Sequence, residues 1–410
     1  MRVVSIDEVS SALRAVPGAE PRVVVSGNFA TPWELLGLAE RALEHCRLFA
    51  MNAQPGWPRR DGVINETPFV GEGVRSDERL DYLPMRLSLV PRLFSSARPP
   101  DVALIHTSPP RDGKVSLGIE VNILPAAIEE VRRRGGLVVA QVNRHMPYTR
   151  GDADIDTDLI DLAIEVDGPL ASPAPRELDD DAQVVGAGVA ALAGDGATIQ
   201  MGIGQLPDAA AQMMIERRHL GVWSEMVSDG VLHLEQAGAL DRDQPVVSTF
   251  LFGSPELYEW AHDNPRLLMG RTEVVNDPGR IAAHPAMLSI NTALQVDLYA
   301  QANASYVRGR IYSGFGGQPD FVSGALHSKG GHSVIALRSW HDKSGQSNIV
   351  PMLATPMCSF QHSAIVTEQG TAAIFGRSQH AQARLLIDHA AHPAARDELR
   401  VSAKERGLAR

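Results

Sequence analysis

The sequence predicts an α/β protein of two domains, each built on a mainly parallel sheet. An apolar run, D-V-A-L-I-H-T, precedes a helical pattern, L-P-A-A-I-E-E-V-R-R-R, and a second apolar run, G-L-V-V-A-Q-V-N, follows. This order of strand, helix and strand is the βαβ unit, whose two strands run parallel. A chain of 410 residues is too long for one ordinary core and suits two domains.

The first half begins with alternating helices and strands. We expect a helix at 5–16, a strand at 21–26 and a helix at 33–43, with a glycine and proline turn before the second helix. The polar segment 52–75 is rich in proline and glycine, and it is either a loop over a site or a plain connection.

The second half repeats the same alternation of elements. We expect a helix from 180, a strand at 197–201, a helix beginning near Pro207 and a strand leading to Glu225. Later segments predict strands at 266–275 and 332–337, and the last forty residues are mostly helical in pattern. A stretch rich in proline and acid before residue 181 predicts the boundary, with domains at 1–178 and 179–410.

Composition excludes several classes of protein. The chain has 38 basic and 49 acidic residues, and a formal charge of −11 argues against a nucleic-acid partner. The first residues carry acids and lack the apolar core of a signal peptide, and no apolar run approaches membrane length. We therefore expect a cytoplasmic protein without a membrane partner. Cys46 and Cys358 have no partner spacing and are expected to be small buried apolar residues.

Glu225 is the first candidate for chemistry. It lies in L-G-V-W-S-E-M-V-S-D-G, between an apolar run and an Asp-Gly turn signal, at the expected end of a buried strand. Upstream, Gly202 and Gly204 follow another strand and precede a helix, where backbone amides can hold an anion. The glycine turn can equally be plain strand-to-helix geometry.

A second glycine-rich turn runs from Ser313 to Gly317. Such a turn permits close backbone approach, which suits an oxyanion hole, although a simple tight loop is the alternative. His389 and His392 are spaced as a pair of metal ligands, but no third ligand is evident and no metal site is predicted. The Gly202-Ile203-Gly204 turn lacks the third glycine of a dinucleotide fingerprint. The chain also has no P-loop and no G-x-S-x-G elbow.

Motifs along nearly the whole chain resemble the acetyl-CoA hydrolase/transferase family, whose members include 4-hydroxybutyrate and acetate CoA-transferases. The matching segments occur in the family's order, and they include Q-V-N-R-H-M-P, Q-M-G-I-G-Q-L-P-D-A, G-V-W-S-E-M-V-S-D-G-V, E-V-V-N-D-P, I-N-T-A-L-Q-V-D-L and Y-S-G-F-G-G-Q-P-D-F. The resemblance implies two CoA-transferase-type α/β domains with the active site between them.

The resemblance also implies roles for particular residues. Glu225 matches the nucleophilic glutamate that carries CoA as a γ-glutamyl thioester. Trp223 stands where the family usually has histidine, and with Ser313 it is expected in the acyl pocket. The backbone of Gly316 and Gly317 is expected to stabilise oxyanions. The residues expected to contact CoA are Gly202, Ile203, Gly204, Gln205, Leu206, Leu294, Gly317 and Lys343.

We therefore expect a CoA-transferase that moves CoA between a short-chain acyl-CoA and a carboxylate such as acetate. A glutamate has an ordinary pKa near 4.3, so it is ionised at neutral pH and needs no general base. CoA is then a substrate, and no bound cofactor is required. An acyl-CoA hydrolase using the same glutamate and a noncatalytic acyl-CoA-binding protein are the alternatives. The resemblance suggests a homodimer or larger oligomer.

Overall fold

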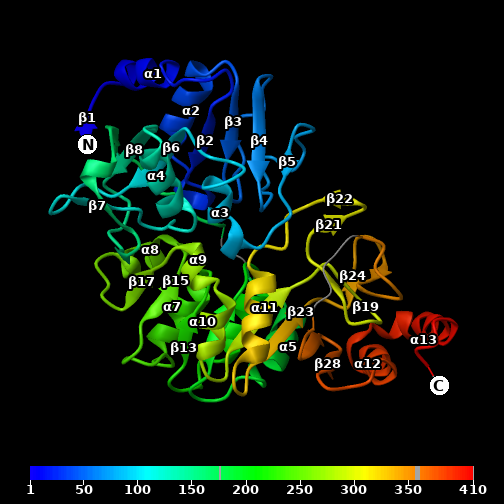
Figure 1. The fold of residues 1–410 in the computed structure, drawn as a ribbon. Helices are drawn as coiled ribbons and strands as arrows, with labels where there is room; N and C mark the ends of the chain where they lie inside the picture. Colours follow the sequence, from blue (N-terminus) through cyan, green and yellow to red (C-terminus); the bar gives the residue numbers. More distant parts are fainter. Residues whose placement is uncertain (175–176, 356–360, 410) are drawn as a thin grey trace. The chain divides into compact units, whose positions relative to one another are not determined.

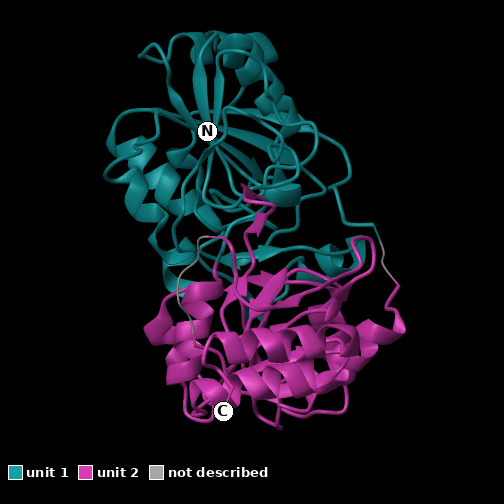
Figure 2. Cartoon of the chain, turned by 90° about the vertical axis from the view of Figure 1, so that its right-hand side faces the viewer, with its two compact units in different colours: residues 1–174, 245–275, 312–316 teal, residues 175–244, 276–311, 317–410 magenta. Residues whose placement is uncertain are grey.

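The computed structural model describes residues 1–174, 177–355 and 361–409, so Cys358 lies outside the described residues. The chain forms two compact units (Figure 2). Unit 1 comprises 1–174, 245–275 and 312–316, and unit 2 comprises 175–244, 276–311 and 317–410. A contiguous division at residue 178 differs from this arrangement, because two later segments of the chain belong to unit 1.

Unit 1 is built on an eight-stranded sheet in which every neighbouring pair is parallel. The strands, in spatial order, are β1 (Arg2–Val3), β11 (Leu162–Val166), β8 (Leu137–Asn143), β6 (Val102–Thr107), β2 (Arg22–Val25), β3 (Cys46–Phe49), β4 (Val63–Thr67) and β5 (Asp81–Tyr82). The strand order reverses between β2 and β6, which makes this point a topological switch point.

Helices surround this sheet because crossovers between parallel strands need them. The helices of unit 1 are α1 (Ile6–Arg14), η1 (Asn28–Ala30), α2 (Trp33–Ala42), η2 (Leu87–Leu89), α3 (Pro91–Phe94), α4 (Leu124–Arg133), η3 (Thr157–Leu159), α8 (Pro255–Ala261) and α9 (Thr272–Val275). The remaining strands are β7 (Lys114–Ser116), β9 (Arg150–Gly151), β10 (Asp154–Asp156), β15 (Val246–Ser248), β16 (Phe250–Leu251) and β17 (Leu267–Met269). The first two predicted helices, the intervening strand and the βαβ unit are confirmed.

The prediction of one strand over 266–275 is wrong in its second half. The strand β17 ends at Met269, and α9 begins at Thr272. The Arg271 amide donates to the Asp152 carboxylate at 2.9 Å, and the Thr272 amide donates to the Asn122 carbonyl at 2.9 Å. These tertiary bonds turn the backbone out of the extended path that its β-branched residues favour.

Unit 2 contains six consecutive strands of a sheet, parallel except at one edge. In spatial order they are β28 (Gly370–Ala373), β27 (Ala364–Thr367), β23 (His332–Ala336), β18 (Leu288–Thr292), β12 (Thr198–Met201) and β13 (Gly221–Trp223). Only β27 and β28 among them pair antiparallel. The chain passes from β12 to β13 on one side, and β18 lies on the other side of β12. The switch point of unit 2 is therefore between β12 and β18.

The helices of unit 2 are α5 (Asp180–Ala190), α6 (Gln205–Met213), α7 (Asp229–Gln236), α10 (Pro278–Ala283), α11 (Gln318–His327), α12 (Gln379–Leu385), η4 (Leu386–Ala390), η5 (Pro393–Ala395) and α13 (Arg396–Glu405). Its other strands are β14 (Met226–Val227), β19 (Gln295–Asp297), β20 (Ala302–Asn303), β21 (Tyr306–Val307), β22 (Arg310–Ile311), β24 (Trp340–His341), β25 (Gln346–Ser347) and β26 (Ile349–Val350). Helices α10 and α11 pack against each other (Figure 1). Among the described residues, no helix is long and apolar enough to cross a membrane.

A buried ion network joins strands of unit 1. The Glu66 side chain is fully buried, and it accepts from Arg22 Nε at 2.7 Å and from Arg47 Nη1 at 3.1 Å. Arg98 also pairs with Glu66. Burial pushes the pKa of Glu66 upward, but the arginine bonds outweigh burial and leave this pKa below its usual value. Cys46 is buried as predicted, and burial raises the pKa of its thiol to about 11.

A second buried carboxyl, Glu120, is bonded by amides, and the described part of the chain places no cation among its bonded neighbours. It accepts from Asn28 Nδ2 at 2.7 Å and from Asn122 Nδ2 at 3.0 Å. Asn122 Oδ1 in turn accepts from the Thr249 hydroxyl at 2.7 Å. Burial raises the pKa of Glu120 to about 7, although both amide donors act to lower it.

The raised pKa of Glu120 predicts a pH-dependent stability. The folded state keeps the proton up to about pH 7, whereas the unfolded state releases it near pH 4.5. The stabilising contribution is therefore complete below pH 4.5 and is lost as the pH rises to about 7. We expect the thermal midpoint advantage of wild type over Glu120→Gln to shrink between pH 5 and pH 8. Glu216→Gln, at an exposed residue, is the control and should parallel wild type. A constant difference between wild type and Glu120→Gln would contradict this interpretation.

Candidate functional site

Glu225 lies at a reversal of the chain at the carboxyl edge of the unit 2 sheet. The strand β13 runs parallel to β12, whereas β14 pairs antiparallel with the end of β12. Ser224, fully buried between them, donates to the Met226 carbonyl at 2.6 Å and accepts from the Met201 amide at 3.3 Å. The serine thereby closes the turn, and Glu225 is half-buried beside it. The predicted position of Glu225 at a strand end is confirmed.

Two residues from other segments of unit 2 lie close to the Glu225 carboxylate. Asn276, which is fully buried, donates from Nδ2 to Glu225 Oε2 at 2.7 Å. A Cβ on Gly317 would overlap Glu225 Oε2, and it would lie 2.5 Å from Asn276 Nδ2. Gly317 has φ −82°, so its backbone conformation does not require glycine. The close approach of the carboxylate is what requires it.

Gly317 is also the N-cap of α11. Glycine has no side chain that could cap the helix, and Pro319 follows in the first turn. A helix N-terminus presents unbonded backbone N–H groups and a partial positive charge. The carboxylate of Glu225 therefore lies where a negative charge is stabilised. The preceding residues belong to unit 1, where Gly316 has φ 54° and lies against the Phe69 ring.

Trp223 packs against His284 at the end of α10. Their ring centroids are 4.6 Å apart with an interplanar angle of 37°. Burial lowers the pKa of His284, which favours a neutral ring at neutral pH. The segment 276–284 therefore contacts the strand end twice, through Asn276 at Glu225 and through His284 at Trp223. Gly324 of α11 allows close packing of α11 on α10, because a Cβ there would overlap Ile281.

The predicted CoA-contacting loop lies at the switch point. Gly202 follows β12 and donates to the Ile290 carbonyl of β18 at 3.0 Å. Gly204 has φ 135°, a conformation open mainly to glycine, and α6 begins at the next residue. Ile203 is 36% exposed, and Gln205 and Leu206 are half-buried. Leu294 follows β18, so both predicted segments leave neighbouring strands at the carboxyl edge, where open α/β sheets bind ligands.

The other predicted site residues lie elsewhere. Ser313 belongs to unit 1, where its carbonyl accepts from the Val70 amide at 2.5 Å. Lys343 is exposed in the connection between β24 and β25. His392 packs against Trp340 with the two ring planes tilted by 35°, and the described part of the chain holds no group of three or more metal-ligating side chains.

The sequence interpretation missed three polar residues around the site. Asn276 was quoted only as part of a resembling motif, and Gln318 was noted only after the glycines. Arg338 donates to Gln205 Oε1 at 3.0 Å and forms two bonds with Asp179, the N-cap of α5. The Asp-Pro after Asn276 signals a helix start, but it gives no sign of the contact with Glu225.

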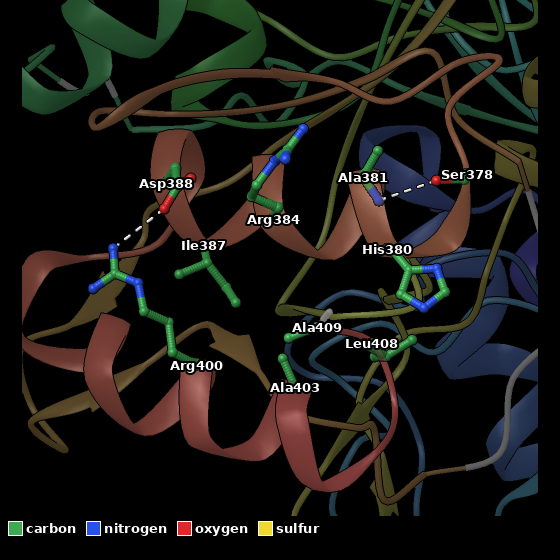
Figure 3. A pocket seen from close by; sticks show the side chains of 10 residues that line it. All are labelled: Ser378, His380, Ala381, Arg384, Ile387, Asp388, Arg400, Ala403, Leu408 and Ala409. Atoms are coloured by element: carbon green, nitrogen blue, oxygen red, sulfur yellow. Dashed lines mark hydrogen bonds and ion pairs between the residues drawn. The ribbon is translucent and has the colours of Figure 1, made fainter.

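A cavity of about 670 Å³ lies away from these residues, between α12, η4 and α13 (Figure 3). Ile387, Ala403 and Leu408 provide its apolar lining, and Arg400 at its edge pairs with Asp388 at 3.2 Å. No predicted site residue lines it. The cavity and the Glu225 site are separate features of unit 2.

Comparisons with known proteins establish the family. Family models match residues 48–170 as the acetyl-CoA hydrolase/transferase N-terminal domain and 253–403 as the C-terminal domain. The 4-hydroxybutyrate coenzyme A transferase of Clostridium kluyveri is 37% identical over an alignment of 353 residues, and the match covers 82% of this chain and 81% of that protein. The chain belongs to the acetyl-CoA hydrolase/transferase family, as the resemblance predicted.

Solved structures agree with this family and fold. A 4-hydroxybutyrate CoA-transferase from Porphyromonas gingivalis has 31% identity and a TM-score of 0.82, and RipA from Yersinia pestis has 27% identity and a TM-score of 0.91. Each likeness covers 99% of this chain and 98% of the other. Some relatives, such as one of 32% identity from Kluyveromyces lactis matched over 48% of this chain, are named acetyl-CoA hydrolase. The predicted α/β class with mainly parallel sheets is confirmed.

The contact between Gly317 and Glu225 predicts a coupling between two substitutions. Gly317→Ala places a methyl group on the carboxylate, and we expect it to cost about 1–3 kcal/mol of unfolding free energy. Glu225→Ala removes the nearest obstructing atoms and leaves Asn276 Nδ2 free to shift, so Gly317→Ala should cost less in that background. Chemical or thermal denaturation of the four proteins measures the coupling.

Gly194→Ala is the matched control for this cycle, because a Cβ there meets open space. It should leave stability nearly unchanged and show no coupling to Glu225→Ala. Equal costs of Gly317→Ala in both backgrounds would show that the two residues do not touch.

Proposed function

We propose that this protein is a CoA-transferase that moves CoA between a short-chain acyl-CoA and a free carboxylate through a thioester on Glu225. The observation that supports it most is the held carboxylate of Glu225, bonded by Asn276 and placed against Gly317 at the N-terminus of α11. A carboxylate nucleophile fits a site in which an amide, that of Asn276, donates to it, because ionised carboxylates need no base.

The proposed reaction has two matched halves. A Glu225 carboxylate oxygen attacks the acyl-CoA carbonyl carbon, the C–S bond breaks, and CoA leaves as a thiolate from an acyl-glutamyl anhydride. The thiolate attacks the glutamyl carbonyl carbon, the anhydride C–O bond breaks, and the first carboxylate leaves. A second carboxylate attacks the resulting glutamyl-CoA and displaces the thiolate, which then attacks the new acyl carbonyl. Glu225 is regenerated, and no net proton transfer is needed.

Each addition places a negative charge on a carbonyl oxygen. The backbone N–H groups of Gly316 and Gly317 are the proposed donors to this charge, since donors fixed before reaction stabilise it at little reorganisation cost. Loss of one such donor typically costs about 3 kcal/mol of transition-state stabilisation. Asn276 keeps the nucleophile oriented, which favours attack from a defined direction.

The long CoA molecule is proposed to bind at the carboxyl edge around the switch point. The proposed contacts are Gly202 to Leu206, which follow β12, Leu294, which follows β18, and Gly317. Lys343 is the proposed cationic partner for a CoA phosphate, and Trp223 and Ser313 are proposed for the acyl group. Binding energy from the remote parts of CoA can then position the thiolate. A homodimer or larger oligomer, a cytoplasmic location and placement of the site between the domains remain predictions.

Hydrolysis is the second candidate, because some relatives are named acetyl-CoA hydrolase. Water attacking the glutamyl thioester or the anhydride would release CoA and a carboxylate. The transferase is favoured by relatives that match far more of this chain, 82% against 48%. A transferase must exclude water from the intermediates, whereas a hydrolase admits it.

Substitution of Glu225 tests the proposal in an exchange assay. With acetyl-CoA and labelled acetate, we expect wild type to transfer label into acetyl-CoA, and Glu225→Gln to lose at least about 10³-fold in rate, since no carboxylate remains to attack. Glu216→Gln, at an exposed residue, should match wild type. If wild type releases free CoA from acetyl-CoA equally fast with and without added carboxylate, the protein is a hydrolase. Full exchange by Glu225→Gln would exclude Glu225 as the nucleophile.

A further inference from the structure

We propose that the side-chain carboxamide of Gln318 binds the carboxylate substrate and then the acyl oxygen of the anhydride derived from it. This role rests on the proposed function and adds a side chain to it. The known contacts of Glu225 involve Asn276 and the backbone of Gly317. Gln318 directly follows Gly317 in the chain, and its side chain is not part of these contacts.

The Gln318 side chain is buried without satisfying its donors. The residue is 8% exposed, and its Nε2 atom is buried with no hydrogen-bond partner among the described residues. A buried amide nitrogen without a partner loses its bonds to water and gains none in return, so such groups are rare in folded proteins. The cost indicates that a partner arrives from outside the chain.

The position of Gln318 identifies where that partner binds. Gln318 is the first residue of α11, directly after Gly317, and consecutive Cα atoms are about 3.8 Å apart. Glu225 Oε2 lies against Gly317, so any group bonded to Glu225 during the reaction is within a side-chain length of Gln318. Asn276 Oδ1 is a second buried atom without a partner there, so the polar groups around Glu225 are incomplete in the absence of substrate.

The chemistry of the missing partner follows from the group that awaits it. The two N–H groups of a carboxamide nitrogen are donors, so the partner offers an acceptor oxygen. A carboxylate is the stronger acceptor, because hydrogen bonds to ionised groups are shorter and stronger. The helix N-terminus beside Gln318 also favours a negative charge. A short-chain carboxylate therefore fits better than the neutral amide carbonyls of the pantetheine arm.

The bond would persist through the covalent steps. As the substrate carboxylate attacks the glutamyl-CoA carbonyl carbon, its other oxygen becomes the acyl carbonyl oxygen of the anhydride and still accepts from Gln318. The thiolate then attacks the acyl carbon, and the developing negative charge falls on that same oxygen. Gln318 keeps its protons throughout.

Two substitutions of Gln318 test the inference with readouts that a purely structural role would not produce. Gln318→Met keeps the side-chain length and removes the N–H donors, and Gln318→Leu is the second variant should the first fold poorly. We expect the KM for acetate in the exchange assay to rise about tenfold or more, with the Kd for free CoA unchanged. We also expect the thermal midpoint of the ligand-free variant to equal or exceed that of wild type, because an unsatisfied buried amide has been removed.

Gln382→Leu is the matched control. Gln382 Nε2 donates to the Ile374 carbonyl at 3.3 Å and to the Arg377 carbonyl at 3.2 Å, so its loss should lower the midpoint and leave the KM for acetate unchanged.

Three results would overturn the role of Gln318. An unchanged KM for acetate would show that Gln318 does not bind the carboxylate. A weaker Kd for CoA with an unchanged KM for acetate would place the pantetheine arm there instead. A lower midpoint with parallel losses in kcat and CoA affinity would show a structural role. If the wild type does not exchange label, the proposed function itself is overturned. If the wild type exchanges label but the Gln318 variants do not show the expected KM, Kd and thermal midpoint, only this inference is overturned.

Discussion

The structure of the site depends on the missing side chain at Gly317. A Cβ at this position would occupy the place of a Glu225 carboxylate oxygen and crowd Asn276 Nδ2. Gly317 is also the N-cap of α11. Because it has no side chain, the carboxylate can approach the positive end of the helix dipole. Glu225, Asn276 and the start of α11 therefore pack closely together, and each limits the position of the other two.

The parallel sheet of unit 2 explains why this contact forms at one edge. In a parallel sheet all carboxyl ends lie on the same side, so the segments after β12, β13 and β18 emerge together. The strand order reverses between β12 and β18, and open α/β sheets typically bind ligands at such a switch point. The site also contains two buried polar atoms without a hydrogen-bond partner among the described residues, Asn276 Oδ1 and Gln318 Nε2, and such atoms reduce stability. Such local costs are common where binding requires ready donors.

The sequence predicted the parts of the fold that short-range patterns determine. The βαβ unit, the strand end at Glu225 and the glycine turn before α6 follow from periodicity and turn residues, and the structure confirms them. Asn276 was missed because it contacts Glu225 across 51 residues of chain, a distance that no local pattern records. The helix α9 was predicted as a strand because its residues are largely β-branched. Hydrogen bonds from the backbone amides at its start to Asp152 and Asn122 override that preference. The return of 245–275 and 312–316 to unit 1 likewise depends on long-range contacts.

The central claim is that CoA is carried covalently by Glu225. Its most direct test is peptide mapping by mass spectrometry after the wild type is mixed with acetyl-CoA, with no added carboxylate, and digested under conditions that preserve thioesters. The account predicts a mass increase corresponding to bound CoA on the peptide containing Glu225, and its discharge when acetate is added before digestion. An adduct on any other peptide, or rapid label exchange with no adduct on any peptide, would contradict it.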